Sequence, residues 1–395
     1  MSIIYVTNNK ITTMDWLDHG EFTDDLESKR VDVVAVAISS WHVLGVEAFL
    51  YDLSNKLERK VEGLILILPH EEEGYLIDET DFSNDFANLK FDFGDPIPDN
   101  QKFIGERVPN FISKYNKMVS GLRKVKSTGV NELYLLSPYV PYIELLLYFD
   151  NDIINTKYNP TFIIIDEGYG TYISKKTLKF AVRKDYALLD FISSKIFRTV
   201  DHVFRTMVYR NMKIEEKFLF KMQSPLIVNK DISESYTAVL KQRHNDLKLP
   251  DMENNVLVVT QPLSELKLVS EDEEMKITRS LIKFLNKRAI KPVFKLHPRE
   301  SIRKYDGLTG CDFEILEGRY PVEEIIPILK PTCVIGFTST AILNSKIFYG
   351  VTAVSLSDIL SRANKEICTA GREFKDLTCN YINFVERIEE LDKFI

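Results

Sequence analysis

Short hydrophobic runs alternate with amphipathic segments along most of this chain, and the first half holds the first series. The runs have the length and β-branched content of buried strands and lie at residues 31–38, 64–68, 132–136 and 161–165, with a weaker edge strand at 89–93. Segments whose hydrophobic residues recur with helical periodicity lie between them, at 46–57, 108–125 and 142–149. Alternation of this kind predicts a parallel sheet covered by helices.

A second series begins near residue 254. Its predicted strands are 255–259, 291–296, 311–316, 333–337 and 352–356, and its predicted helices are 275–287, 321–329 and 340–348. A chain of 395 residues is long for one hydrophobic core, so two domains are expected. We therefore predict the α/β architecture known as GT-B, in which two Rossmann-like, doubly wound domains face each other across a cleft.

The predicted domain boundaries follow from the two series. The N-terminal domain spans 1–250 and carries a basic helical insertion at about 171–222, while the C-terminal domain spans 251–380. The last segment, 381–395, is predicted to form a helix that packs back on the first domain.

Composition narrows the class of protein. With 45% hydrophobic and 28% charged residues, the chain has the composition of a soluble globular protein. Its net charge of −7 gives no indication of nucleic-acid binding. It has neither an evident signal sequence nor an apolar run of about 18 residues, so a cytoplasmic location is expected.

Basic and aromatic residues alternate between residues 175 and 221. This pattern fits a peripheral contact with the anionic inner face of a membrane. It fits equally well a solvated basic surface over an ordinary hydrophobic core, and the sequence leaves both interpretations open.

Three predicted strands end in residues that could carry chemistry. Asp166-Glu167-Gly168 follows the strand at 161–165. A carboxylate that is partly shielded at a strand end can have its pKa raised toward the range of a general base. Gly168 would let the chain turn and a substrate approach closely. Taken alone, the same residues also fit a turn with solvated acids.

The other two strand ends lie in the second series. In His297-Pro298 the proline ends the strand, and the imidazole can donate to a phosphate or protonate a leaving group. Thr338-Ser339-Thr340 would place hydroxyls and free N–H groups at the start of a helix, which is a site for anions. A core histidine and simple N-capping by Ser or Thr are the non-functional alternatives.

Other common catalytic motifs are absent. The chain has no HExxH zinc motif, its six histidines are dispersed, and no GxSxG serine-hydrolase motif occurs. Neutralising a leaving phosphate with a histidine and a helix terminus needs no metal ion.

Taken together, the three strand ends resemble the bacterial sialyltransferase superfamily. Members carry an acidic pair with a glycine, then His-Pro, then a Ser/Thr-Ser pair, and this sequence has Asp166-Glu167-Gly168, His297-Pro298 and Thr338-Ser339 in that order. The sequence departs from the usual pattern at Glu167, where Asp is common, and at Thr338, where Ser is more usual. Both replacements keep the chemical group.

The resemblance implies roles for individual residues. Glu167 would be the general base, and His297 would contact the phosphate of CMP and assist its departure. Thr338 and Ser339 would hold the same phosphate. The remaining residues expected to bind substrate are Asp166, Gly168, Pro298, Thr340, Gln261 and Glu323, with Glu324 close to Glu323; Ser40, Trp41, His42 and Tyr139 are expected to contact the acceptor.

The sequence thus predicts an inverting, metal-independent sialyltransferase without a cofactor. Its donor would be a CMP-activated sialic acid or related nonulosonic acid, and its acceptor an oligosaccharide or glycolipid of a bacterial capsule or lipooligosaccharide. Two alternatives remain. One is a GT-B glycosyltransferase that uses another nucleotide sugar, and the other is a non-catalytic glycan-binding or assembly protein with the same fold.

Overall fold

The computed structural model of the chain describes two compact units. Unit 1 comprises Met1–Lys10, Gly168–Lys184 and Phe220–Ile395, and unit 2 comprises Ile11–Glu167 and Asp185–Leu219. The residues described are 2–5, 7–8, 16–17, 30–37, 39–61, 63–67, 77, 89–92, 126–127, 134–138, 161–166, 168, 172, 214–216, 219–221, 223–244, 247–248, 255–266, 268–317, 320–361 and 365–395.

Unit 2 is built on a seven-stranded sheet in the order β11-β10-β9-β5-β6-β7-β3, in which every pairing is parallel. Its strands are β3 (Trp16–Leu17), β5 (Val33–Ala37), β6 (Gly63–Ile67), β7 (Leu89–Asp92), β9 (Tyr134–Pro138), β10 (Thr161–Ile165) and β11 (Ile214–Glu216). The first strand along the chain, β3, lies at one edge beside β7; the chain then enters the centre of the sheet at β5, runs outward through β6 and β7, and returns to pair β9 with the other side of β5. The strand order therefore reverses between β5 and β9.

Helix α2 (Ser40–Leu57) follows β5 and covers this sheet. Ser39 caps the helix, because its hydroxyl accepts from the His42 N–H at 3.4 Å. Every second residue of β5 (Val33, Ala35 and Ala37) is buried and joins the helix in one hydrophobic core, as the two-residue period of a strand requires. A separate short pair joins β4 (Arg30–Val31) to β8 (Lys126–Ser127).

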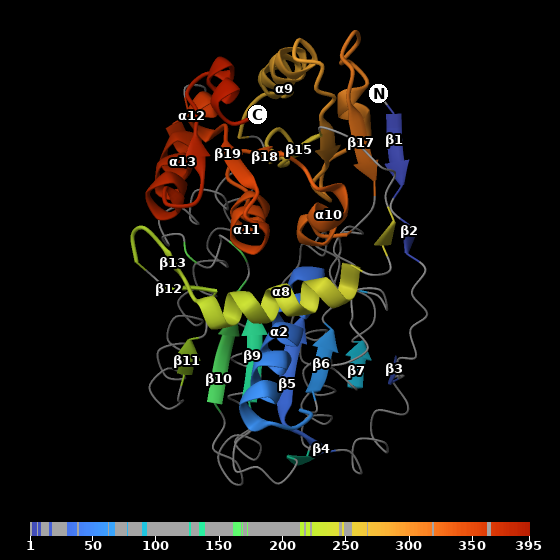
Figure 1. Cartoon of the computed structure of the whole chain (residues 1–395), viewed down its shortest axis with the longest axis vertical. Helices are drawn as coiled ribbons and strands as arrows, with labels where there is room; N and C mark the ends of the chain where they lie inside the picture. Colours follow the sequence, from blue (N-terminus) through green and yellow to red (C-terminus); the bar gives the residue numbers. More distant parts are fainter. Residues whose placement is uncertain are drawn as a thin grey trace, which may run out of the picture. The chain divides into compact units, whose positions relative to one another are not determined.

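Unit 1 repeats the same winding. Its sheet has the order β1-β17-β16-β15-β18-β19-β20, again with every pairing parallel. Its strands are β1 (Ser2–Tyr5), β15 (Val256–Val259), β16 (Val293–Lys295), β17 (Glu314–Glu317), β18 (Cys333–Gly336), β19 (Thr352–Ser355) and β20 (Asn383–Phe384). β15 is the central strand, and the order reverses between β15 and β18. Figure 1 shows this sheet with β1 at its edge beside β17.

The helices of unit 1 pack on this sheet and on one another. They are α8 (Lys230–His244), α9 (Glu271–Asn286), α10 (Val322–Leu329), α11 (Thr340–Tyr349), α12 (Ser357–Leu360) and α13 (Lys365–Thr378), with 3₁₀ helices η4 (Ile302–Tyr305) and η5 (Ile388–Lys393). α9 begins in a capping box formed by Ser270 and Glu273. α8 contacts both α10 and α11, beside which Figure 1 draws it.

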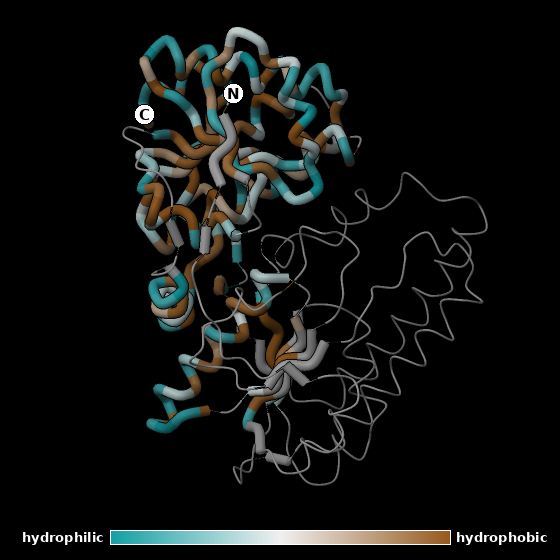
Figure 2. The backbone as a smooth tube through the Cα atoms, turned by 90° about the vertical axis from the view of Figure 1, so that its right-hand side faces the viewer, coloured by the Kyte–Doolittle hydropathy of each residue, from teal (hydrophilic) through white to brown (hydrophobic). Residues whose placement is uncertain are grey.

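One hydrophobic core of unit 1 lies on the face of the sheet that α9 covers. It includes alternate residues of the central strands, such as Val256 and Val258, together with Leu281 and Leu285 of α9. Figure 2 shows hydrophobic strands inside this unit and hydrophilic turns around them. Two antiparallel pairs complete unit 1: β2 (Thr7–Asn8) with β14 (Leu247–Lys248), and β12 (Phe220–Lys221) with β13 (Ile227–Val228).

The predicted fold class is confirmed, because both units are doubly wound, parallel α/β sheets of the Rossmann type used by GT-B proteins. The boundaries differ from the predicted 1–250 and 251–380. β1 pairs with β17, and α8 packs on α10 and α11, so both ends of the first predicted segment belong to unit 1.

The C-terminal segment also differs from its prediction. Residues 383–384 form β20, and residues 388–393 form a 3₁₀ helix rather than an α-helix. Leu391 is buried in the core of unit 1, and Arg288 of α9 binds Asp392. The tail therefore packs on the same unit as α9, whereas the sequence analysis had expected it on the first domain. The predicted helices at 108–125 and 142–149, and most of the basic insertion, lie outside the described residues.

Candidate active site

The candidate site lies where the strand order of unit 1 reverses. In open, doubly wound sheets, ligands bind beyond the carboxyl ends of the strands at this reversal. The loop after β15 begins with Thr260 and Gln261, and the loop after β18 contains Thr338 and Ser339. His297 follows the neighbouring strand β16. Topology thus brings three of the predicted segments to one edge of one sheet.

A side-chain amide joins two of these loops. The Gln261 Oε1 atom accepts from the Thr338 N–H at 2.7 Å and from the Thr338 hydroxyl at 3.3 Å. Ser339 caps α11 by accepting from the Ala341 N–H at 3.2 Å. The first turn of α11 therefore presents partly exposed hydroxyls at the positive end of a ten-residue helix. This arrangement suits an anion such as a phosphate.

Gly336, the last residue of β18, allows close packing at this edge of the sheet. A Cβ atom there would lie 3.0 Å from the Val259 carbonyl oxygen and 2.9 Å from a methyl group of Ile342. The absence of a side chain thus lets β18, β15 and α11 approach one another closely.

His297 is the first residue of a tight turn, His297–Glu300. The Glu300 N–H donates to the His297 carbonyl at 2.9 Å, and Pro298 occupies the second position, where its fixed φ suits the turn. The Arg299 N–H donates to the Nδ1 atom of His297 at 3.2 Å. Because Nδ1 accepts this hydrogen bond, a neutral imidazole carries its proton on Nε2. The ring therefore has a donor on the side away from its own backbone.

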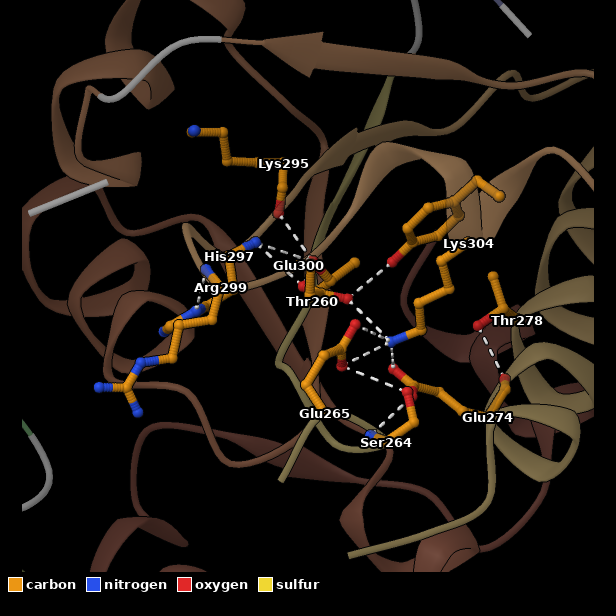
Figure 3. A network of polar contacts seen from close by, with 11 residues as sticks. Thr260, Ser264, Glu265, Glu274, Thr278, Lys295, His297, Arg299, Glu300 and Lys304 are labelled. Carbon is orange, nitrogen blue, oxygen red and sulfur yellow. Dashed lines mark hydrogen bonds and ion pairs between the residues drawn. The ribbon is translucent and has the colours of Figure 1, made fainter. Parts of the chain in front are cut away.

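A buried polar cluster lies behind this turn (Figure 3). Figure 3 shows Glu300 and Thr260 between His297 and Lys304, with Glu265 and Glu274 around the lysine amine. The Lys304 amine lies 2.7 Å from Glu274, 3.1 Å from Glu265 and 3.3 Å from Glu300.

Burial and charge together shift the pKa values of two groups in this cluster. Burial disfavours the charged form of Lys304, but its hydrogen bonds and the surrounding carboxylates outweigh that cost and raise its pKa. For Glu274 burial has the opposite effect and raises the pKa, and the hydrogen bonds with Lys304 and Ser264 offset only part of it. The cluster is therefore held together around a cation that keeps its proton.

The side chain of Glu323, which is expected to bind the nucleotide, is directed toward α11. Its side chain is buried and accepts from the Asn344 amide at 2.8 Å. Burial raises the pKa of Glu323, and the Asn344 hydrogen bond offsets only part of that effect. Its neighbour Glu324 forms a buried ion pair with Arg243 of α8 at 2.8 Å. In this structure both carboxylates join helices rather than line the loops at the strand ends.

Gly168 makes a close approach to the third motif. Its φ of +96° belongs to the region that favours glycine, and a Cβ atom there would lie 2.7 Å from the Thr340 hydroxyl oxygen. Both residues belong to unit 1. Asp166, two residues earlier, is buried at the end of β10. Glu167, the predicted base, lies outside the described residues.

Three of the four predicted acceptor residues, Ser40, Trp41 and His42, follow β5 in unit 2. Ser40 begins α2 directly after the central strand, at the point where the strand order reverses. His42 is only 6% exposed and Trp41 is partly exposed. Tyr139 lies outside the described residues. The first turn of α2 thus occupies the topological position of a ligand site, with Ser40 at its surface and His42 inside.

Comparison with known families identifies the lineage of the chain. A family model described as alpha-2,8-polysialyltransferase matches residues 34–358, a range that contains all three strand-end motifs. The chain belongs to the alpha-2,8-polysialyltransferase family. Comparison with curated protein sequences gives no match.

Several solved structures are similar to this polysialyltransferase-family chain. An alpha/beta-galactoside alpha-2,3-sialyltransferase from the luminous marine bacterium Photobacterium phosphoreum shares 13% identity at a TM-score of 0.45, covering 92% of this chain and 100% of that one. A sialyltransferase from Photobacterium damsela shares 11% identity at 0.40, covering 89% and 81%. The UDP-GlcNAc 2-epimerase of Methanocaldococcus jannaschii shares 10% identity at 0.48, covering 92% and 91%.

Two properties of this family member concern the described residues only. Within the described ranges, no group of three or more His, Cys, Asp or Glu side chains is placed to hold a metal ion. None of the helices described has both the length and the hydrophobicity needed to cross a membrane.

The structure of this polysialyltransferase-family chain also adds residues that the sequence analysis did not single out. Glu300 contacts the backbone of His297, and Arg243 binds Glu324. A signal for Glu300 exists in the sequence, because an acid three residues after the start of a Pro-containing turn can fold back on it. Nothing in the sequence pairs residue 243 with residue 324, since the contact joins two separate helices.

Proposed function

We propose that this chain is an inverting, metal-independent sialyltransferase that uses a CMP-activated sialic acid or a related nonulosonic acid. The observation that carries the proposal is the family match over residues 34–358. It spans the acidic-glycine, His-Pro and Thr-Ser motifs, whose described residues follow the strands of doubly wound sheets. The expected acceptor is an oligosaccharide or glycolipid.

The donor phosphate is proposed to bind at the edge of unit 1. The hydroxyls of Ser339 and Thr340 and the amino terminus of α11 would neutralise part of its charge. The Nε2–H group of His297 would donate to the phosphate oxygen that takes the electrons as the bond to the sugar breaks. In this structure the Thr338 N–H donates to the Gln261 side chain. The same N–H can therefore donate to a phosphate only if Gln261 turns aside.

The acceptor is proposed to be activated by Glu167. As general base, this carboxylate would remove a proton from the acceptor hydroxyl while the oxygen attacks the anomeric carbon opposite the leaving CMP. Attack from the opposite side inverts the anomeric configuration. The alpha-2,8 linkage in the family's description makes the 8-hydroxyl of a terminal sialic acid the acceptor group we expect. Residues after β5, including Ser40, are proposed to contact the acceptor.

The cellular setting follows from the same proposal. We expect a cytoplasmic enzyme, where CMP-sugars are available, and a peripheral contact of the basic region 175–221 with anionic lipid. No resident cofactor or nucleic-acid partner is part of this proposal.

Ligand-dependent stability tests the donor first. The purified protein is heated with CMP, UDP, GDP or ADP. A ligand that binds the folded state raises the midpoint of thermal unfolding by mass action. A shift with CMP alone supports the proposal. A shift with UDP or GDP instead points to a GT-B transferase with another donor, and no shift with any nucleotide favours the non-catalytic alternative.

Transfer itself is then measured as CMP release from CMP-sialic acid in the presence of an alpha-2,8-linked sialic acid oligomer. Longer oligomers are expected, with one CMP released for each sialic acid residue added. EDTA should leave the rate unchanged, and a complete loss that added metal reverses would contradict the metal-independent mechanism.

A further inference from the structure

The carboxylate of Glu300 is enclosed by hydrogen-bond donors. Its side chain is fully buried. One oxygen accepts from the Tyr305 hydroxyl at 3.0 Å and from the Lys304 amine at 3.3 Å. The other accepts from the His297 N–H at 3.0 Å and from the Thr260 hydroxyl. Four donors for two oxygens fill the acceptor capacity of a carboxylate. A side chain at this position that had to donate a hydrogen bond would therefore face another donor.

Glu300 binds His297 through both its side chain and its backbone. The side chain of Glu300 accepts from the His297 N–H, while the Glu300 N–H donates to the His297 carbonyl at 2.9 Å. Thr260 adds a second acceptor for the His297 N–H, at 3.1 Å. Both backbone groups of the histidine are thus fixed by one neighbour, three residues along the chain.

Fixing this turn also fixes the imidazole. The Arg299 N–H that donates to Nδ1 of His297 belongs to the same turn, so its direction depends on the turn keeping its shape. If the turn opened, Nδ1 would lose its donor, and either ring nitrogen could carry the proton. The orientation of the Nε2–H group therefore depends on a buried carboxylate that binds the backbone of the same turn.

We propose that Glu300 is a positioning residue that holds the His297–Glu300 turn, and thereby presents the Nε2–H group of His297 to the departing phosphate. The inference rests on the proposed function of His297. Lys304 helps to hold Glu300 in place, because its amine binds Glu300 and is itself bound by Glu265 and Glu274. Glu300 acts through His297 and needs no contact with the substrate.

Glu300→Gln tests the proposal with almost no change in size. The amide NH₂ of glutamine would face either the Lys304 and Tyr305 donors or those of His297 and Thr260, so one side of the cluster must separate. We expect kcat to fall by about 10- to 100-fold, as misplacement of a reacting group by about 1 Å does. KM for the CMP-sugar should change by less than about threefold, because the hydroxyls of α11 remain in place.

A double-mutant cycle separates positioning from general destabilisation. In a His297→Ala background, Glu300→Gln should lower kcat no further, because the group that it positions is gone. An equal loss in both backgrounds, or an unchanged kcat in the single variant, would overturn the proposal. Glu390→Gln is the matched control. It makes the same replacement at an ion pair with the exposed Arg387, outside this cluster, so kcat should stay within about twofold.

Thr260 supplies a second test if Glu300→Gln folds poorly. Thr260→Ser keeps the hydroxyl between Glu300 and the His297 N–H, whereas Thr260→Val removes it at constant size. Thr260→Ser should retain much more of kcat than Thr260→Val. Equal rates for the two variants would contradict the proposed positioning network.

Nitrogen NMR of labelled histidine makes the test independent of transfer. In the wild type, the Nδ1 signal of His297, assigned by its loss in His297→Ala, should have the shift of an unprotonated nitrogen above the imidazole pKa. Glu300→Gln should move that shift toward a mixture of tautomers. If the Nδ1 signal does not move in Glu300→Gln, Glu300 does not position His297, whether or not the enzyme is active. A wild type without transfer but with the expected signals would refute the proposed function and leave the positioning of His297 intact.

Discussion

The buried ion pair between α8 and α10 offers a quantitative test of how unit 1 is held together. Arg243 and Glu324 lie 2.8 Å apart, with side chains only 2% and 3% exposed. At that distance and an effective dielectric constant of about 20, their Coulomb attraction is about 6 kcal/mol. Glu324→Leu removes the attraction and the desolvation cost of the carboxylate, but it leaves the arginine buried without its charge partner. The expected loss in the free energy of unfolding is about 3–5 kcal/mol.

The assay is urea unfolding followed by far-UV circular dichroism. Both tryptophans, Trp16 and Trp41, belong to unit 2, so their fluorescence does not report on unit 1 directly. The double variant Arg243→Met/Glu324→Leu should recover to within about 1 kcal/mol of the wild type, because it buries no unpaired charge. A control at the exposed Lys291–Asp312 pair, Asp312→Asn, should cost less than about 1 kcal/mol.

Two results would refute this reasoning. One is a loss below about 1 kcal/mol in Glu324→Leu, which would mean that the pair is solvated in solution. The other is a double variant as unstable as the sum of the single variants, because coupling is what defines the pair. The same variants also test the role of Glu324, since CMP affinity should be unchanged if its carboxylate serves α8 rather than the nucleotide.

Three further predictions concern the candidate site and its strands. Glu167→Gln should nearly abolish transfer while the thermal shift with CMP stays close to that of the wild type; normal turnover would exclude this residue as the base. Gly168→Ala should destabilise the protein by about 1–3 kcal/mol because of its φ of +96° and the nearby Thr340 hydroxyl, and adding Thr340→Ala should restore only part of the loss in Tm. Burial lowers the pKa of Lys295 from 10.5 to about 8; the unfolded chain therefore binds more protons between those values, and this residue adds stability as pH rises from 8 toward 10.5. Lys295→Met should remove that rise in urea-unfolding curves and be the more stable protein at pH 7, whereas a parallel pH dependence in both proteins would show that Lys295 is not neutral when folded.

Local sequence pattern was sufficient for the central strands of both sheets and for helices α2, α9, α10 and α11. The hydrophobic runs at 161–165 and 255–259 end at polar residues, and the structure has β10 at 161–165 and β15 at 256–259. Helix α11 follows its Ser339 cap as predicted. These features were predictable because apolar content, periodicity and capping act over a few neighbouring residues. Helices α8, α12 and α13 were not predicted.

The candidate site was only partly predictable from the same information. Placing His297 and Thr338 at strand ends required just the strands and the residues that end them. The hydrogen bond from Thr338 to Gln261 and the burial of Glu323 against Asn344 depend on which loops and helices become neighbours. Side chains 77 and 21 residues apart in sequence meet there, and no local pattern specifies such a meeting.

The sequence by itself determined that this chain is a parallel α/β protein with three polar strand ends in a fixed order. Only the tertiary structure decided that residues 2–5 extend the sheet of unit 1 beside β17, and that Leu391 at the other end of the chain is buried in the core of the same unit. The reason is physical: a strand edge accepts any segment whose N–H and C=O groups can pair with it, and a hydrophobic core accepts any apolar side chain that fits. Such partners are selected by the assembled fold, not by the residues next to them in the chain.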